Sequence, residues 1–98
     1  MKMIHKFIEQ IDEELEGAKE YAERYIENRA KGNSNRASKY KEMAGDELRH
    51  AGYVYDFAVM DVADIKKVYP MPIEAEEAWN HAMKHYAECV AMVKHMLT

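Results

Sequence analysis

The feature that most constrains the fold is the recurrence of apolar residues at three- and four-residue spacing through three long segments. That spacing places apolar side chains on one face of an α-helix, and no segment shows the alternation typical of a half-buried strand. Gly32 and the two prolines Pro70 and Pro72 separate the segments, because glycine favours helix ends and proline cannot continue a helix interior. The pattern predicts an all-α protein with helices over about residues 2–30, 35–68 and 73–97.

The two breaks between the predicted helices are short, so consecutive helices are expected to run antiparallel, as a helical hairpin followed by a third helix. Gly32 suits a left-handed C-cap of the first helix, and Ser34 or Asn35 suits the N-cap of the second. The 98 residues are expected to form one domain. The core of so short a chain is small, so association between subunits is expected to help stabilise it.

Composition narrows the classes of function. Hydrophobic residues make up 48% and charged residues 33% of the chain, which is typical of a soluble globular protein. The formal net charge is −4 with no basic patch, which argues against a nucleic-acid-binding protein. No apolar run approaches the roughly 18 residues of a membrane span, and acids such as Glu9 and Asp12 interrupt any secretory apolar region. Cys89 is the only cysteine, which fits a reducing cytoplasm.

The residues that point to chemistry are Glu47 and His50. They are three apart on the second predicted helix, so they share a face, and Glu47 falls within the apolar stripe. A carboxylate that faces a core is costly unless it is paired or binds a cation. An inward-facing Glu-x-x-His is a building block of dinuclear iron or manganese sites in helix bundles, in which two further helices each add one glutamate.

The first predicted helix must supply that glutamate. Glu14 flanks its apolar stripe and is the predicted partner, with Glu16 or Glu20 as alternatives. Six acids of this helix point away from the stripe: Glu9, Glu13, Glu16, Glu20, Glu23 and Glu27. Most of this acidic run is therefore expected to be a solvated face.

Glu14, Glu47 and His50 make up half of a dinuclear site, because the complete set has four carboxylates and two imidazoles. The apolar stripe of the third helix contains no acid, so a second copy of the chain is expected to supply the other half. The sequence thus predicts a homodimer, or a larger even-numbered oligomer, that completes a four-helix bundle around two metal ions. Asp46 is a candidate acceptor for a ligating histidine. Tyr21, two turns after Glu14, is the candidate catalytic residue beside the metals.

Other interpretations assign these residues plainer roles. Glu47 could form a salt bridge with Arg49 or with a lysine of another helix. His81 and His85 have the i, i+4 spacing of a chelating pair, although solvated histidines on a polar face are the more common case. Cys89 is expected to be a small core residue rather than a nucleophile.

Two stretches resemble the ferritin-like superfamily: residues 11–21, Ile-Asp-Glu-Glu-Leu-Glu-Gly-Ala-Lys-Glu-Tyr, and residues 46–51, Asp-Glu-Leu-Arg-His-Ala. The chain is most similar to the short encapsulated-ferritin type, whose chains build a di-iron centre across a subunit interface. The resemblance implies that Glu14, Glu47 and His50 take the ligand places and that Tyr21 lies nearby. It also implies oxidation of Fe(II) by dioxygen or peroxide, with manganese or zinc as alternative metals.

Two further hypotheses remain open from the sequence. One is a non-enzymatic structural or metal-binding protein that keeps the helical scaffold. The other is a helical adaptor that uses the third predicted helix to dock onto a partner.

Overall fold

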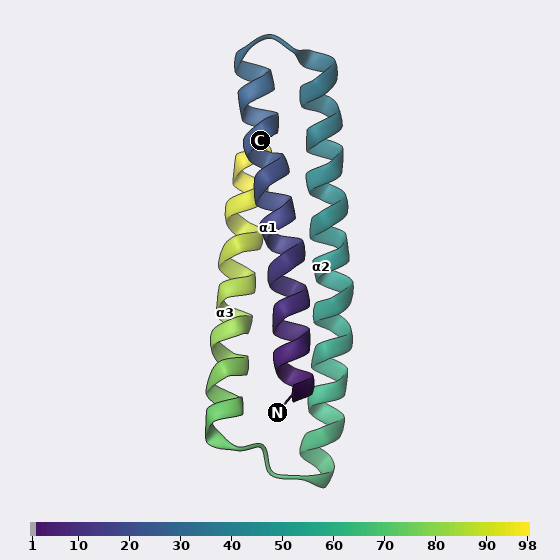
Figure 1. The fold of residues 1–98 in the computed structure, drawn as a ribbon, viewed down its shortest axis with the longest axis vertical. Helices are drawn as coiled ribbons and strands as arrows, with labels where there is room; N and C mark the ends of the chain where they lie inside the picture. Colours follow the sequence, from purple (N-terminus) through teal and green to yellow (C-terminus); the bar gives the residue numbers. More distant parts are fainter. Residues whose placement is uncertain (1) are drawn as a thin grey trace.

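The chain forms three α-helices. In the computed structural model, which describes residues 2–98, they are α1 (Lys2–Ala30), α2 (Ser34–Val68) and α3 (Ile73–Met96), with no strand in that range. The all-α class predicted from the sequence is confirmed, and the helix ends lie within one residue of those expected. The molecule is a rod, 55 Å long and 18 Å across. In it α1 contacts both α2 and α3, and the three helices run side by side along the rod (Figure 1). No helix among the described residues is long and apolar enough to cross a membrane.

The turn between α1 and α2 is a Schellman motif. Gly32 has a φ of 78°, the Asn33 amide donates to the carbonyl of Asn28 at 2.9 Å, and the Gly32 amide donates to that of Arg29 at 3.1 Å. The predicted C-cap role of Gly32 is therefore confirmed. The predicted N-cap at Ser34 or Asn35 is wrong, because α2 begins at Ser34 and Asn33 is its N-cap. Asn33 thus closes α1 and opens α2, which shortens the turn by a residue.

Alanines line the contact between α1 and α2. Five of them have no exposed surface: Ala18 and Ala22 on α1, and Ala44, Ala51 and Ala58 on α2. Small side chains let the two backbones approach closely, and they fix the register that brings acids of α1 opposite α2. They also leave a thin core, because Ile4 and Val93 are the largest of the described side chains that are fully buried.

Larger side chains pack α3 against the hairpin. Trp79 lies in a buried cluster with Ile4 and Val62 at one end of the rod. Tyr55 of α2 stacks on Tyr86 of α3, with ring centroids 4.3 Å apart, and more distantly on Trp79, at 6.4 Å. Since α3 packs against this side of the hairpin, another edge of the α1–α2 pair stays open to solvent.

Candidate metal centre

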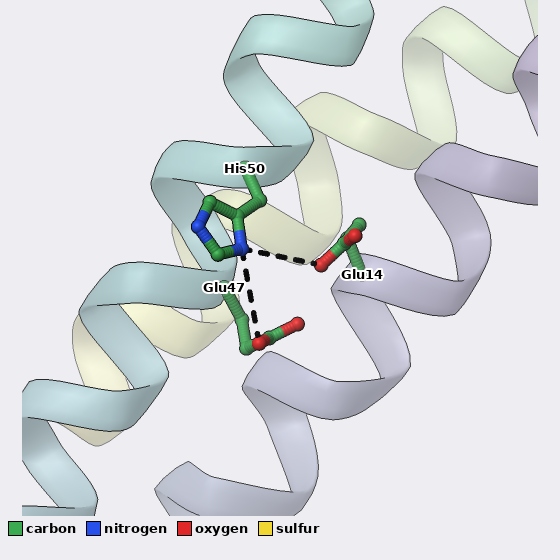
Figure 2. Close-up of side chains that lie close together, drawn as sticks. All are labelled: Glu14, Glu47 and His50. Atoms are coloured by element: carbon green, nitrogen blue, oxygen red, sulfur yellow. Dashed lines mark ion pairs between the residues drawn. The ribbon is translucent and has the colours of Figure 1, made fainter.

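Glu14, Glu47 and His50 converge at that open edge. Each offers one ligand atom, and these atoms all lie within 4.8 Å of one another. The Nδ1 atom of His50 is 3.7 Å from Oε2 of Glu14 and 3.9 Å from Oε1 of Glu47 (Figure 2). The structure therefore brings together the three side chains that the sequence singled out, one from α1 and two from α2.

Helix geometry explains how the group is assembled. Glu47 and His50 are three residues apart on α2, so their side chains lie on neighbouring turns of one face. On α1, Gly17 lies one turn after Glu14, directly against Glu47. A Cβ atom on Gly17 would lie only 3.1 Å from Oε2 of Glu47, so the glycine leaves room for the carboxylate.

Gly17 is a residue of the site that the sequence reasoning did not single out. A glycine inside a helix costs roughly 1 kcal/mol relative to alanine, so a mid-helix glycine is a reason to look for a close contact at that position. Gly17 lies mid-helix, three residues from a candidate ligand, and that position was the available signal.

The carboxylates of Glu14 and Glu47 lie close enough to repel each other when both are ionised. The Glu14 carboxylate, by hydrogen bonding and by charge, and partial burial together raise the pKa of Glu47 above its ordinary value. Among residues 2–98 neither Glu14 nor Glu47 has a lysine or arginine nitrogen within 4.0 Å; their only ion-pairing partner is His50. The side chains are about one-quarter exposed, at 27% and 26%, so solvent screens their repulsion only in part. A bound divalent cation would remove that repulsion.

The alternative role of Glu47, a salt bridge with Arg49, is not observed. Arg49 pairs instead with Asp46 on the exposed side of α2. Asp46, the candidate acceptor for a ligating histidine, is thus engaged by its own helix. Glu47 is left facing Glu14, which is the arrangement that a cation would favour.

The remaining predicted residues lie outside the group. Tyr21 is half-buried and stacks on Tyr40 of α2 at a centroid distance of 6.2 Å, two turns along α1 from the cluster. Glu20, one alternative partner, forms an ion pair with Arg24 at 3.0 Å. Glu16, the other alternative, lines a cavity between α1 and α3. Glu14, the predicted partner on α1, is therefore the glutamate that lies against Glu47 and His50 of α2.

An exposed apolar stripe runs along α2 beside the group. Positions 43, 50 and 57 are seven residues apart and share a face, and position 53 lies one turn from position 50. The large apolar side chains on this stripe are Met43, Tyr53 and Phe57, of which Tyr53 is 60% and Phe57 62% exposed. We call these three residues the α2 stripe. His50 lies within it, so any partner that covers the stripe also covers the candidate metal ligands.

The donor set has a clear chemical preference. Two anionic oxygens and one imidazole nitrogen are ligands for hard or borderline divalent cations such as Fe²⁺ and Mn²⁺, and the set contains no soft sulfur donor. Three side chains cannot fill the coordination sphere of two such ions. The group therefore fits a site that is completed by ligands from elsewhere.

Comparison of the chain with protein-family models, curated proteins and solved structures returned no match. The resemblance to ferritin-like proteins thus rests on the residues of the two stretches described above.

Proposed function

We propose that the protein binds iron in a dinuclear centre between two copies of the chain and oxidises Fe(II) there. The observation that supports this most directly is the convergence of Glu14, Glu47 and His50, with no lysine or arginine of residues 2–98 paired to either carboxylate. Uncompensated carboxylates that are partly shielded from water are destabilising, and a cation is the simplest compensation. In this proposal the chain is a ferritin-like protein in a reducing cytoplasm, where Fe(II) persists.

The proposed partner is a second copy of the same chain. Two copies related by a twofold axis would supply four carboxylates and two imidazoles, the complete set for two ions in a helix bundle. The α2 stripe supports this arrangement, because it places exposed apolar side chains before and after His50 along α2. Exposed apolar patches of this kind often mark protein–protein interfaces. Packing stripe against stripe would bury Phe57 and Tyr53 and bring the two half-sites together.

The chemistry follows from the donors. Glu14 and Glu47 would hold the iron through hard carboxylate oxygens, which favour Fe(III) over Fe(II), and each bound Fe(II) would supply one electron to dioxygen or peroxide. His50 contributes a neutral nitrogen, which keeps the site from accumulating excess negative charge. Manganese would fit the same donors, and zinc would bind without electron transfer.

Metal content tests the site. The purified protein is loaded with Fe(II) under anaerobic conditions, and the iron per chain is measured after gel filtration. We expect one iron per chain, two per dimer, and loss of most of it in Glu47→Ala and in His50→Ala. Glu20→Ala and His95→Ala are matched controls, because they remove an acid and a histidine outside the group. Undiminished iron in both ligand variants would refute the site.

Oxygen consumption separates an enzyme from a metal-binding scaffold. On addition of Fe(II), the proposed ferroxidase consumes dioxygen faster than buffer does, and His50→Ala returns the rate to that of buffer. A non-enzymatic structural protein that keeps the helical scaffold would bind iron, or none, and consume dioxygen at the buffer rate throughout. That result would retain the fold and remove the catalytic function.

A further inference from the structure

A second cluster of metal-binding side chains lies in the groove between α1 and α3. The groove holds an open cavity of about 530 Å³, and a second cavity of about 340 Å³ continues it toward the start of α1. Asp12 and His85 line both cavities, and Cys89 lines the larger one. The proposed iron site uses none of these residues.

In this groove one ring nitrogen of His85 lies close to two other donor atoms. The Sγ atom of Cys89 is 3.4 Å from Nε2 of His85, and that same nitrogen is 4.0 Å from Oδ1 of Asp12. His85 and Cys89 are four residues apart, so α3 presents them on one face, and Asp12 comes from α1. The sulfur and oxygen donors, from two helices, thus each lie within 4.0 Å of one ring nitrogen, while the Cys89 sulfur and the Asp12 carboxylate are more than 4.8 Å apart.

The spacing can be compared with that of a tetrahedral metal site. Zinc bond lengths place a sulfur and a nitrogen ligand about 3.6 Å apart, and a nitrogen and an oxygen ligand about 3.4 Å apart. The Cys89–His85 distance of 3.4 Å already matches, whereas the Asp12 carboxylate must move about 1 Å or more toward the Cys89 sulfur to complete a tetrahedral set. The Asp12 and His85 side chains are about half exposed, so that adjustment requires no repacking of the core.

The charges around the cluster favour a cation. Asp12, Glu16 and Glu88 line the larger cavity, against the single cation Lys19. Burial and the nearby Asp12 raise the pKa of the Cys89 thiol, so without a metal this cysteine is a poor nucleophile. A catalytic cysteine is therefore the less suitable interpretation of the Cys89–His85 pair.

We propose that Asp12, His85 and Cys89 form a second metal site, selective for a thiophilic divalent cation such as Zn²⁺. Thiolate and imidazole select such ions, whereas Glu14, Glu47 and His50 offer no sulfur. Asp12 and Glu14 are two residues apart on α1 and so point to nearly opposite sides of that helix. The two sites share no donor, and this inference does not depend on the proposed iron centre.

Cobalt(II), a spectroscopic substitute for zinc, tests the proposal. We expect Co²⁺ to produce a thiolate-to-cobalt charge-transfer absorption with one ion per chain, and excess Zn²⁺ to abolish it. Cys89→Ser should lose the absorption. His85→Gln and Asp12→Asn should each weaken Co²⁺ binding at least as much as the roughly 10–100-fold that loss of an outer-shell partner costs. Far-UV circular dichroism establishes that each variant is folded.

Two controls make the outcome decisive. His95→Gln removes an exposed histidine outside the groove and should leave the absorption unchanged, as should the double variant Glu47→Ala and His50→Ala. Absence of a thiolate absorption at excess Co²⁺, or an absorption that His85→Gln leaves unchanged, would overturn the proposal. So would saturation at one Co²⁺ per two chains, because it would indicate Cys89 residues of two chains sharing one ion.

Discussion

Gly17→Ala is the substitution that most directly tests the geometry of the candidate iron site. A Cβ atom at position 17 would lie 3.1 Å from Oε2 of Glu47, tighter than nearly all real Cβ contacts. The Glu47 carboxylate is the end of a flexible side chain, so it can move away rather than force the helices apart. The substitution should therefore displace one candidate ligand while leaving the fold intact.

Gly45→Ala is the reference variant, because it shows how much a helical glycine-to-alanine change stabilises this protein when no side chain has to move. Gly45 is also inside a helix, but a Cβ atom there would meet nothing within 4 Å outside its own helix. Replacing a helical glycine by alanine stabilises a helix by about 1 kcal/mol, which corresponds to a rise in Tm of roughly 4–8 °C for a chain of this size. Gly45→Ala should show that full increase.

Gly17→Ala should show less. Pushing the Glu47 side chain off its rotamer costs about 0.5–1.5 kcal/mol, which offsets most or all of the gain in helix propensity. The metal-free variant is therefore expected to melt within a few degrees of the wild type, and its affinity for Fe²⁺ or Mn²⁺ should fall about tenfold or more.

Thermal melts in chelator and isothermal titration with Mn²⁺ measure the two quantities. The informative comparison is between the two alanine variants, because both change the same type of residue in a helix. If Gly17→Ala gained as much stability as Gly45→Ala and bound Mn²⁺ with wild-type affinity, Glu47 could not lie against Gly17. The close approach of α1 to this carboxylate, and the site built on it, would then be wrong.

Three further predictions follow from particular contacts. Since Glu14 and burial raise the pKa of Glu47, this one group contributes stability to the metal-free protein below the ordinary glutamate pKa of 4.5, and that contribution is lost as pH rises through the raised pKa. Glu47→Gln should therefore resist urea better than the wild type at pH 7, in the presence of chelator, and match it near pH 4; a variant that is weaker at pH 7 would contradict the repulsion. Phe57→Asp should weaken dimerisation about 100-fold or more, because each copy loses the burial of one aromatic ring, whereas Ile73→Asp, on a residue of α3 that is 72% exposed against 62% for Phe57, should not. Sedimentation velocity measures the dimerisation of both variants. If Phe57→Asp and Ile73→Asp dimerised equally well, the α2 stripe would be excluded as the interface. Trp79→Ala should lower the free energy of unfolding by about 3–5 kcal/mol, measured by urea denaturation, because the ring is 96% buried between helices; a loss below about 1 kcal/mol would show that α3 is not docked there.

The helices could be predicted because their information is local. Apolar spacing and the two breaks between segments predict the ends of all three helices to within one residue. Gly32 was predicted as a left-handed C-cap because glycine is the residue that most readily adopts a positive φ. The N-cap was misplaced by one or two residues because Asn33 serves the end of α1 and the start of α2 at once. Spacing alone cannot show that one residue has both roles.

The candidate iron ligands could be predicted because each departs from its helical pattern. Glu47 lies in an apolar stripe, and Glu14 lies at the edge of one, so both were conspicuous before any packing was known. Gly17 was not, since its role depends on which side chain of α2 lies opposite. The Asp12–His85 contact likewise depends on how α3 is rotated against α1. The i, i+4 spacing of His85 and Cys89 was the signal that the sequence offered.

The placement of the two candidate sites leads to a difference in how they exchange metal. Packing of two α2 stripes against each other would enclose Glu14, Glu47 and His50 between subunits. The groove between α1 and α3 lies on the other side of α1 and would stay open to solvent. Iron should then leave mainly from dissociated chains, whose fraction rises on dilution, whereas zinc bound by His85 and Cys89 should exchange at a rate independent of dimerisation. Dilution should therefore speed the removal of iron by chelator and leave the removal of zinc unchanged, and equal sensitivity of the two would indicate that one interface covers both.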